Sequence, residues 1–203
     1  GKLDFVKDIC KRQGKEFEFA FLLDALEEEQ EQGITIDTSQ IFFNTQKRRY
    51  VIIDAPGHKE FLKNMVTGAA NAESALLLID AHEGIQEQSR RHGYILKLLG
   101  LTQVAVVINK MDLVNYDPEV YYKIKTEYTK FLGSMGIEAR EFIPVSAKLG
   151  VNIAKTSEEI SWYKGPSVLS MLDQFTEKQP PTHLPFRFPV QDVYKFDERR
   201  IIS

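Results

Sequence analysis

The chain contains very little cysteine, since Cys10 is the only one among 203 residues. No disulfide can therefore form within the chain, and the sequence predicts a reducing compartment, the cytoplasm. Basic and acidic side chains nearly balance, at 26 and 29, which leaves a net charge of −3. This small charge gives no electrostatic reason to expect nucleic acid as the main partner.

Long apolar runs are missing as well. No run approaches the roughly 20 residues that a membrane-spanning helix needs. Residues 1–5 do not have the pattern of a signal peptide. We therefore expect no association with a membrane.

The composition that is present is typical of a folded globular protein, with 43% hydrophobic and 27% charged residues. A length of 203 residues suffices for one domain and part of another. The proline-rich stretch 179–185 predicts a stiff linker. It divides the chain into a main domain at 1–178 and the start of a second, β-barrel domain at 186–203, whose residues 186–194 alternate like a strand.

Helical and strand-like patterns alternate along the main domain. Near-continuous valine, isoleucine and leucine strands between helices indicate an α/β fold with a mostly parallel sheet and helices on both faces. Strands are predicted at 75–79, 104–108 and 141–145, and helices at 3–12, 18–31, 59–70, 86–99, 117–135 and after Pro166. Residues 38–44 and 48–53 predict a hairpin whose second strand enters the core and whose first is an antiparallel edge strand.

Polar residues follow four of the predicted strands at the point where each strand ends. They are Asp54, Asp80, Asn109 and Ser146. Because ligands of open α/β sheets bind at the carboxyl ends of the strands, we expect these four residues to share one rim of the sheet.

The segment Asp54-Ala55-Pro56-Gly57-His58 has the chemistry of a phosphate site. Asp54 can hold a water bound to Mg²⁺, a cation that usually keeps several waters. Gly57 has no Cβ, so its backbone can come close to a terminal phosphate. His58 can orient an attacking water.

A threonine upstream offers a second ligand for the same metal. Thr35 lies in the segment Gly33-Ile34-Thr35-Ile36-Asp37. Its hydroxyl can bind Mg²⁺, and its amide can donate to a γ-phosphate. Such contacts would order the segment in one nucleotide state and release it in the other.

The segment Asn109-Lys110-Met111-Asp112 can recognise a base. A carboxylate such as that of Asp112 accepts two parallel N–H bonds, which guanine presents through N1–H and its 2-amino group and adenine does not. The alkyl stem of Lys110 can lie over the base. The amide of Ala147, directly after Ser146, can contact the guanine carbonyl oxygen.

These ordered segments resemble the GTP-binding domain of the translation-factor GTPase superfamily. Segment 33–37 resembles its first switch, 54–58 its DxPGH box, 109–112 its NKxD box and 146–147 its SA box. The resemblance covers the chain from about residue 17 to its end and implies a P-loop GTPase domain that binds GTP or GDP with Mg²⁺. It implies that His58 is catalytic and that Thr35 and Asp54 hold the metal. The nucleotide-binding residues that it implies are Thr35, Asp54, Ala55, Pro56, Gly57, Asn109, Lys110, Asp112, Ser146 and Ala147.

Within this superfamily the chain most resembles the large GTPase subunit of ATP sulfurylase, sulfate adenylyltransferase subunit 1. Segments 21–26, 88–92, 162–166 and 188–194 carry this likeness. Elongation factors resemble this chain nearly as closely, but they generally have a glycine-rich stretch where this chain has residues 195–200. The resemblance implies GTP hydrolysis coupled to adenylyl sulfate synthesis in sulfate assimilation, with a small catalytic subunit as partner and no nucleic acid. A translation elongation factor that delivers aminoacyl-tRNA is the alternative.

One motif of the superfamily is absent from the sequence. No GxxxxGK[ST] occurs, and Gly1-Lys2 is followed by Leu3 rather than by serine or threonine. We expect a truncation before or at this loop rather than a natural GTPase without it. The 203 residues alone are expected to bind nucleotide weakly or not at all, because the loop supplies the phosphate cradle, a lysine and one Mg²⁺ ligand. A remnant that only docks on a partner is the third possibility.

Overall fold

A three-stranded parallel sheet forms the centre of the computed structural model, in the order β3 (Ala75–Asp80), β4 (Val104–Asn109) and β5 (Ala139–Pro144). Strand β4 lies in the middle, and its first five residues are buried, which explains its unbroken apolar sequence. The three strands were predicted, although β5 begins two residues earlier than expected. The structure describes residues 39–54, 66, 70, 72–177, 185, 193–196 and 199–202.

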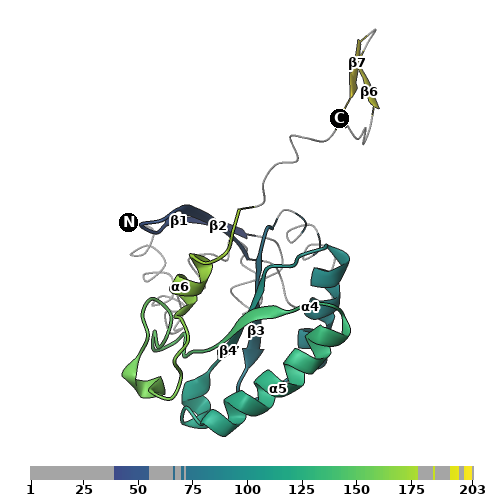
Figure 1. Ribbon diagram of the computed structural model, residues 1–203. Coiled ribbons are helices and arrows are strands. Elements are labelled where there is room, and N and C mark those ends of the chain that lie inside the picture. Colours follow the sequence, from purple (N-terminus) through teal and green to yellow (C-terminus); the bar gives the residue numbers. More distant parts are fainter. Residues whose placement is uncertain are drawn as a thin grey trace, which may run out of the picture.

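Helices cover both faces of this sheet (Figure 1). Helices α4 (Glu87–Leu98) and α5 (Pro118–Ser134) pack against one face, where Val104, Val106 and Ile108 point. The short α6 (Val168–Leu172) packs against Ala105 and Val107 on the other face. The predicted α/β class with a parallel sheet and an antiparallel pair is thus confirmed, as are the predicted helices 86–99 and 117–135 and the helix after Pro166.

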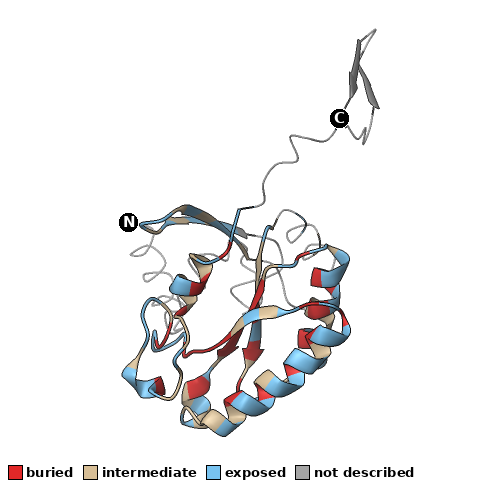
Figure 2. Cartoon of the chain, viewed as in Figure 1, coloured by how far each residue is buried: buried red, intermediate tan, exposed pale blue. Residues whose placement is uncertain are grey.

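The sequence of α5 shows why this helix forms and which face it buries. The Asp117 side chain caps its first turn by accepting from the Glu119 amide at 2.8 Å, and Pro118 follows at the first helical position. Its buried residues recur every three or four positions, at Tyr121, Ile124, Tyr128 and Leu132. In Figure 2 the buried residues accordingly gather on the strands and on the inward sides of the helices.

Two of the buried residues on α5 are tyrosines, and both phenols have hydrogen-bond partners. Tyr121 donates to the Phe142 carbonyl at 2.9 Å, and Tyr128 donates to the Ser89 carbonyl at 2.6 Å. Burial raises the pKa of both phenols, so they remain neutral donors. These bonds join α5 to strand β5 and to helix α4.

A separate antiparallel hairpin is formed by β1 (Ser39–Asn44) and β2 (Arg49–Asp54). The hairpin was predicted, and its turn begins at Thr45, but the prediction that β2 is buried in the core is wrong. Within the described residues β2 pairs only with β1, so Val51 and Ile52 remain 49% and 41% exposed.

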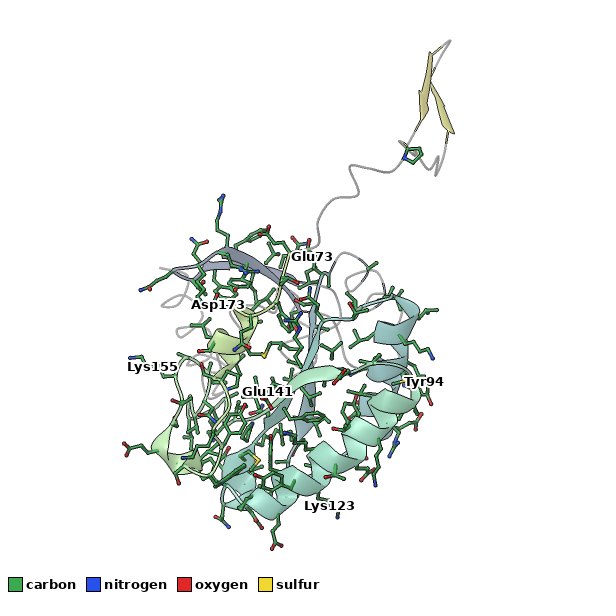
Figure 3. The ribbon with its side chains drawn as sticks, viewed as in Figure 1. Glu73, Tyr94, Lys123, Glu141, Lys155 and Asp173 are labelled. Atoms are coloured by element: carbon green, nitrogen blue, oxygen red, sulfur yellow. The ribbon has the colours of Figure 1, made fainter. Side chains whose placement is uncertain are left out.

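Polar side chains fasten the turn end of this hairpin to the chain around the end of α6. Tyr50 and Thr45 donate to one carboxylate oxygen of Asp173, at 2.6 and 2.9 Å, and Arg48 donates to the Phe175 carbonyl at 2.6 Å. Figure 3 labels Asp173 beside the hairpin. Burial and the bond to the carboxylate raise the pKa of Tyr50 to about 12, and the same bond lowers the pKa of Asp173.

Strands β6 (Val193–Phe196) and β7 (Arg199–Ile202) form a further antiparallel pair. Only the last two residues of the strand predicted at 186–194 fall in β6, which continues to Phe196, and residues 186–192 lie outside the described residues. The predicted helices 3–12 and 18–31, and nearly all of 59–70, also lie outside them. Among the residues that the structure does describe, no helix is long and apolar enough to cross a membrane.

Candidate functional site

The turn after β4 carries the segment Asn109–Asp112 that was predicted to recognise a base. Lys110 adopts a left-handed conformation, φ 61°, which bends the chain sharply at the strand end. Met111 is fully buried, and its amide donates to the Val145 carbonyl at 3.1 Å. The burial of Met111 forces its neighbours outward, so Lys110 is exposed and Asp112 is half-buried at the carboxyl end of the sheet.

The loop after β5 lies next to this turn and is tied to it directly. Ser146 is fully buried and pairs with Val151 across a tight turn. The amide of the exposed Ala147 donates to Oδ1 of Asn109 at 2.9 Å. The structure thus brings together the five residues predicted for the base half of the site, namely Asn109, Lys110, Asp112, Ser146 and Ala147.

Asp80, at the end of β3, belongs to the same rim and contacts Lys110. Its Oδ2 lies 2.7 Å from Lys110 Nζ, and its Oδ1 accepts from the amides of His82 and Glu83 at 2.8 and 3.2 Å. Burial alone would raise the pKa of this carboxyl, but these donors outweigh it and hold the pKa below its usual range. The hydrogen bond to Asp80 in turn raises the pKa of Lys110.

The sequence placed Asp80 on the rim but gave it no role. Its position could have suggested a role, because Asp80 and Asn109 are register partners at the last residues of β3 and β4. A side chain at the end of β3 can therefore reach across to Lys110, the residue that follows Asn109.

The phosphate half of the predicted site is described only at Asp54, the last residue of β2. Asp54 ends a strand of the separate hairpin rather than of the three-stranded sheet. Thr35, Ala55, Pro56, Gly57 and His58 lie outside the described residues. Within the described ranges, no cluster of three or more histidine, cysteine, aspartate or glutamate side chains could hold a metal ion.

Comparison with known families decides the ancestry of this arrangement. The model described as the elongation factor Tu GTP binding domain matches residues 3–179. The chain belongs to this family. Membership confirms the predicted translation-factor type of GTPase domain, with which binding of GTP or GDP is associated.

Individual relatives narrow the likeness. The chain is 46% identical over 193 residues to elongation factor 1-alpha of Methanosphaerula palustris, covering 94% of this chain and 45% of that protein. It is 45% identical over 182 residues to elongation factor 1-alpha of Thermococcus gammatolerans, covering 90% and 42%. The chain thus spans less than half the length of these relatives.

Solved structures of related proteins support the same fold. A bacterial selenocysteine-specific elongation factor, EF-Sec, is similar with a TM-score of 0.63 at 28% identity, over 89% of this chain and 29% of that one. The structure of sup35 complexed with GDP is similar with a TM-score of 0.58 at 25% identity, over 99% and 46%.

These comparisons correct the narrower prediction. The assignment to the large subunit of sulfate adenylyltransferase, and with it a role in sulfate assimilation, is wrong, because relatives matched over at least 90% of the chain are named elongation factor 1-alpha. Residues 195–200, which favoured that assignment over an elongation factor, overlap the end of β6 and the start of β7. So short a segment carries little information about which branch of a superfamily a chain belongs to.

The predicted partners are corrected for the same reason. The prediction that a small catalytic subunit is the partner is wrong, and so is the prediction that the protein binds no nucleic acid. A net charge of −3 is a sum over the whole chain. Such a sum excludes neither a local basic surface nor contacts made by other parts of a longer protein.

Proposed function

We propose that this chain is the GTP-binding domain of a translation elongation factor of the 1-alpha type. On this proposal the whole protein binds aminoacyl-tRNA while GTP is bound and releases it when GTP is hydrolysed on the ribosome. Two relatives at 45–46% identity, both named elongation factor 1-alpha, support the assignment.

The observation that carries the proposal is the bond between Asn109 Oδ1 and the Ala147 amide. It joins two loops, which follow two different strands, in one arrangement. Loops that are held together in this way lose less conformational entropy on binding than free loops would. In this arrangement Asp112 is the residue that pairs with N1–H and the 2-amino group of guanine, and the carbonyl oxygen of the base lies near Ala147.

Lys110 contributes to base binding through its stem rather than its charge. Its ammonium group is occupied by Asp80 at 2.7 Å. The four-carbon stem between this anchor and the backbone is thereby restricted, and it forms one apolar wall for the base. The charge of Asp112 also lies near enough to contribute, after that of Asp80, to the raised pKa of Lys110.

The phosphate half of the site is proposed from Asp54 and from the residues around it in the sequence. Asp54 and Thr35 would hold Mg²⁺ through oxygen ligands, the type that this cation prefers. When bound, the metal neutralises charge on the phosphates. The backbone of Ala55, Pro56 and Gly57 would face the terminal phosphate, and His58 would orient the attacking water.

Ribosome-dependent GTP hydrolysis tests the proposed function. It should be measured with the 203-residue chain and with the whole protein of which we propose it to be a domain, each with aminoacyl-tRNA and with or without ribosomes programmed with mRNA. We expect hydrolysis by the full protein to rise with ribosomes and to fall when His58 is replaced by alanine. If the full protein binds GTP but its rate of GTP hydrolysis does not change when ribosomes are added, the proposed role in translation is refuted.

A further inference from the structure

We propose that Trp162, in the loop after β5, is a positioning residue for Asp112 and therefore belongs to the base-recognition site. The inference rests on the proposed function, since it concerns the same site. It assigns a role in that site to a residue that lies fifty positions further along the chain.

The turn that carries Asp112 is flanked on both sides by residues whose backbone conformation is unfavourable. A 3₁₀ helix spans Met111–Val114, and left-handed residues flank it, Lys110 before it and Asn115 and Tyr116 after it. Asparagine tolerates this conformation, but a bulky residue such as Tyr116, at φ 54°, does so at a cost. A backbone of this kind persists only where its surroundings hold it in place.

Hydrogen bonds hold the turn at its two ends. At the start, the Met111 amide donates to the Val145 carbonyl at 3.1 Å. At the far end, Tyr116 donates its amide to the Met111 carbonyl at 2.8 Å and accepts at its own carbonyl from Trp162 Nε1 at 3.0 Å. The indole is thus a contact from outside the turn that meets the backbone of the strained residue directly.

Trp162 is itself well fixed, so it can restrain the turn. Its ring lies 5.1 Å from the ring of the buried Tyr121 on α5, centroid to centroid. Two residues before it, Ile160 is 1% exposed. Earlier in the same loop, the Asn152 side chain donates to the Pro144 carbonyl at 3.0 Å. The loop is therefore anchored to β5 and to α5, and the indole N–H transmits this anchoring to Tyr116.

The side chain of Tyr116 also lies near Asp112. Burial, and next the charge of Asp112, raise the pKa of the Tyr116 phenol. A change of backbone at Tyr116 would therefore move a group beside the carboxylate that is to read guanine. Loss of the indole N–H should loosen the turn and weaken discrimination between bases, while the core stays intact.

The test uses the 203-residue chain and exploits the fact that Trp162 is its only tryptophan. Two variants remove the N–H donor: Trp162→Phe, and replacement of Trp162 by its sulfur isostere benzothienylalanine, which keeps the size of the ring. Tyr122→Phe is the matched control, because Tyr122 contacts the same indole, at 6.1 Å between centroids, but makes no bond to the turn. Amide hydrogen exchange is followed by NMR, and GMP and AMP are titrated at millimolar concentrations.

We expect exchange at the amides of residues 115–117 to rise about fivefold in both Trp162 variants, as the loss of one hydrogen bond implies. Exchange in α4 should not change, and the preference for GMP over AMP should fall by a similar factor. Unchanged exchange at 115–117, or an equal rise in the Tyr122→Phe control, would overturn the positioning role. So would a GMP preference that both variants keep in full.

A different result would contradict the proposed function rather than the role of Trp162. If the unaltered chain bound GMP and AMP alike, the base site would be wrong whatever happened to the exchange rates. A Trp162→Phe chain that unfolds would show fast exchange in α4 as well, and the isosteric variant would then decide.

Discussion

Replacement of Asp80 by asparagine should remove the charge that holds Lys110 at the rim of the sheet. The asparagine oxygen can still accept from the amides of His82 and Glu83, so the turn after β3 should survive. What is lost is the ion pair at 2.7 Å and the extra strength that a charge gives to the two amide bonds.

The magnitude follows from the exposure of the two partners. The Lys110 side chain is 54% exposed and that of Asp80 17% exposed, so the pair contributes only about 0.2–1 kcal/mol. With the weaker amide bonds included, we expect Asp80→Asn to lower the free energy of unfolding by about 1 kcal/mol. For a chain of this length that corresponds to a fall in Tm of about 2–4 °C.

The effect should depend on pH with a defined sign. The pKa of Asp80 is lower in the folded chain than its ordinary value of about 4. Its contribution is therefore complete above that ordinary value and disappears as the pH falls through the folded pKa. Asp80→Asn should be less stable than the unaltered chain at pH 7, and the difference should shrink as the pH falls below about 4.

Urea unfolding at pH 7, 5, 4 and 2 measures this difference, if circular dichroism confirms that both chains are folded at each pH. Glu87→Gln is the control, since it breaks an ion pair of 2.6 Å with Arg91 whose glutamate is 85% exposed. That variant should have almost no effect on stability. A deficit of the Asp80 variant that is equal at all pH values would refute the electrostatic argument.

Three further predictions concern the core and the nucleotide. Gly93→Val should cost about 1–3 kcal/mol in a thermal melt, because even a Cβ there would lie 2.9 Å from Phe131; Gly133→Ala, with open space around it, should instead gain up to about 1 kcal/mol. Tyr128→Phe should cost about 1 kcal/mol in urea unfolding through loss of the bond to the Ser89 carbonyl, and an unchanged midpoint would contradict this. Fluorescent GDP should bind the 203-residue chain weakly, and submicromolar affinity would contradict the expected need for the absent GxxxxGK[ST] motif.

The sequence was enough to predict those parts of the fold in which the pattern of apolar residues matches the faces that are buried. Strand β4 is apolar at its first five positions because both of its faces are covered, and α5 repeats apolar residues every three or four positions because one face is covered. The position of β2 could not be predicted in this way. Its residues 51–53 are apolar like those of a core strand, yet in the described residues it pairs with β1 alone.

The meeting of the two loops in the candidate site could be expected from single residues and their positions after the strands. Asn109, Asp112 and Ala147 were recognised by their spacing after the strands, and the structure brings their loops together. The contact that Trp162 makes was not predictable from the sequence. The hydrogen bond from Trp162 to Tyr116 joins residues 46 positions apart. It depends on the left-handed backbone of Tyr116, which a tyrosine in the sequence does not predict.

Recognition of guanine by Asp112 is the central claim, and an exchange of base preference tests it most directly. Xanthine carries an acceptor at position 2 where guanine carries an amino donor, and an asparagine at position 112 would offer a donor in place of one carboxylate oxygen. NMR titrations of the unaltered chain should show shifts at residues 110–112 and 147 with GMP but not with XMP or AMP. The Asp112→Asn chain should respond to XMP and lose its response to GMP. An Asp112→Asn chain that still prefers GMP would contradict the account.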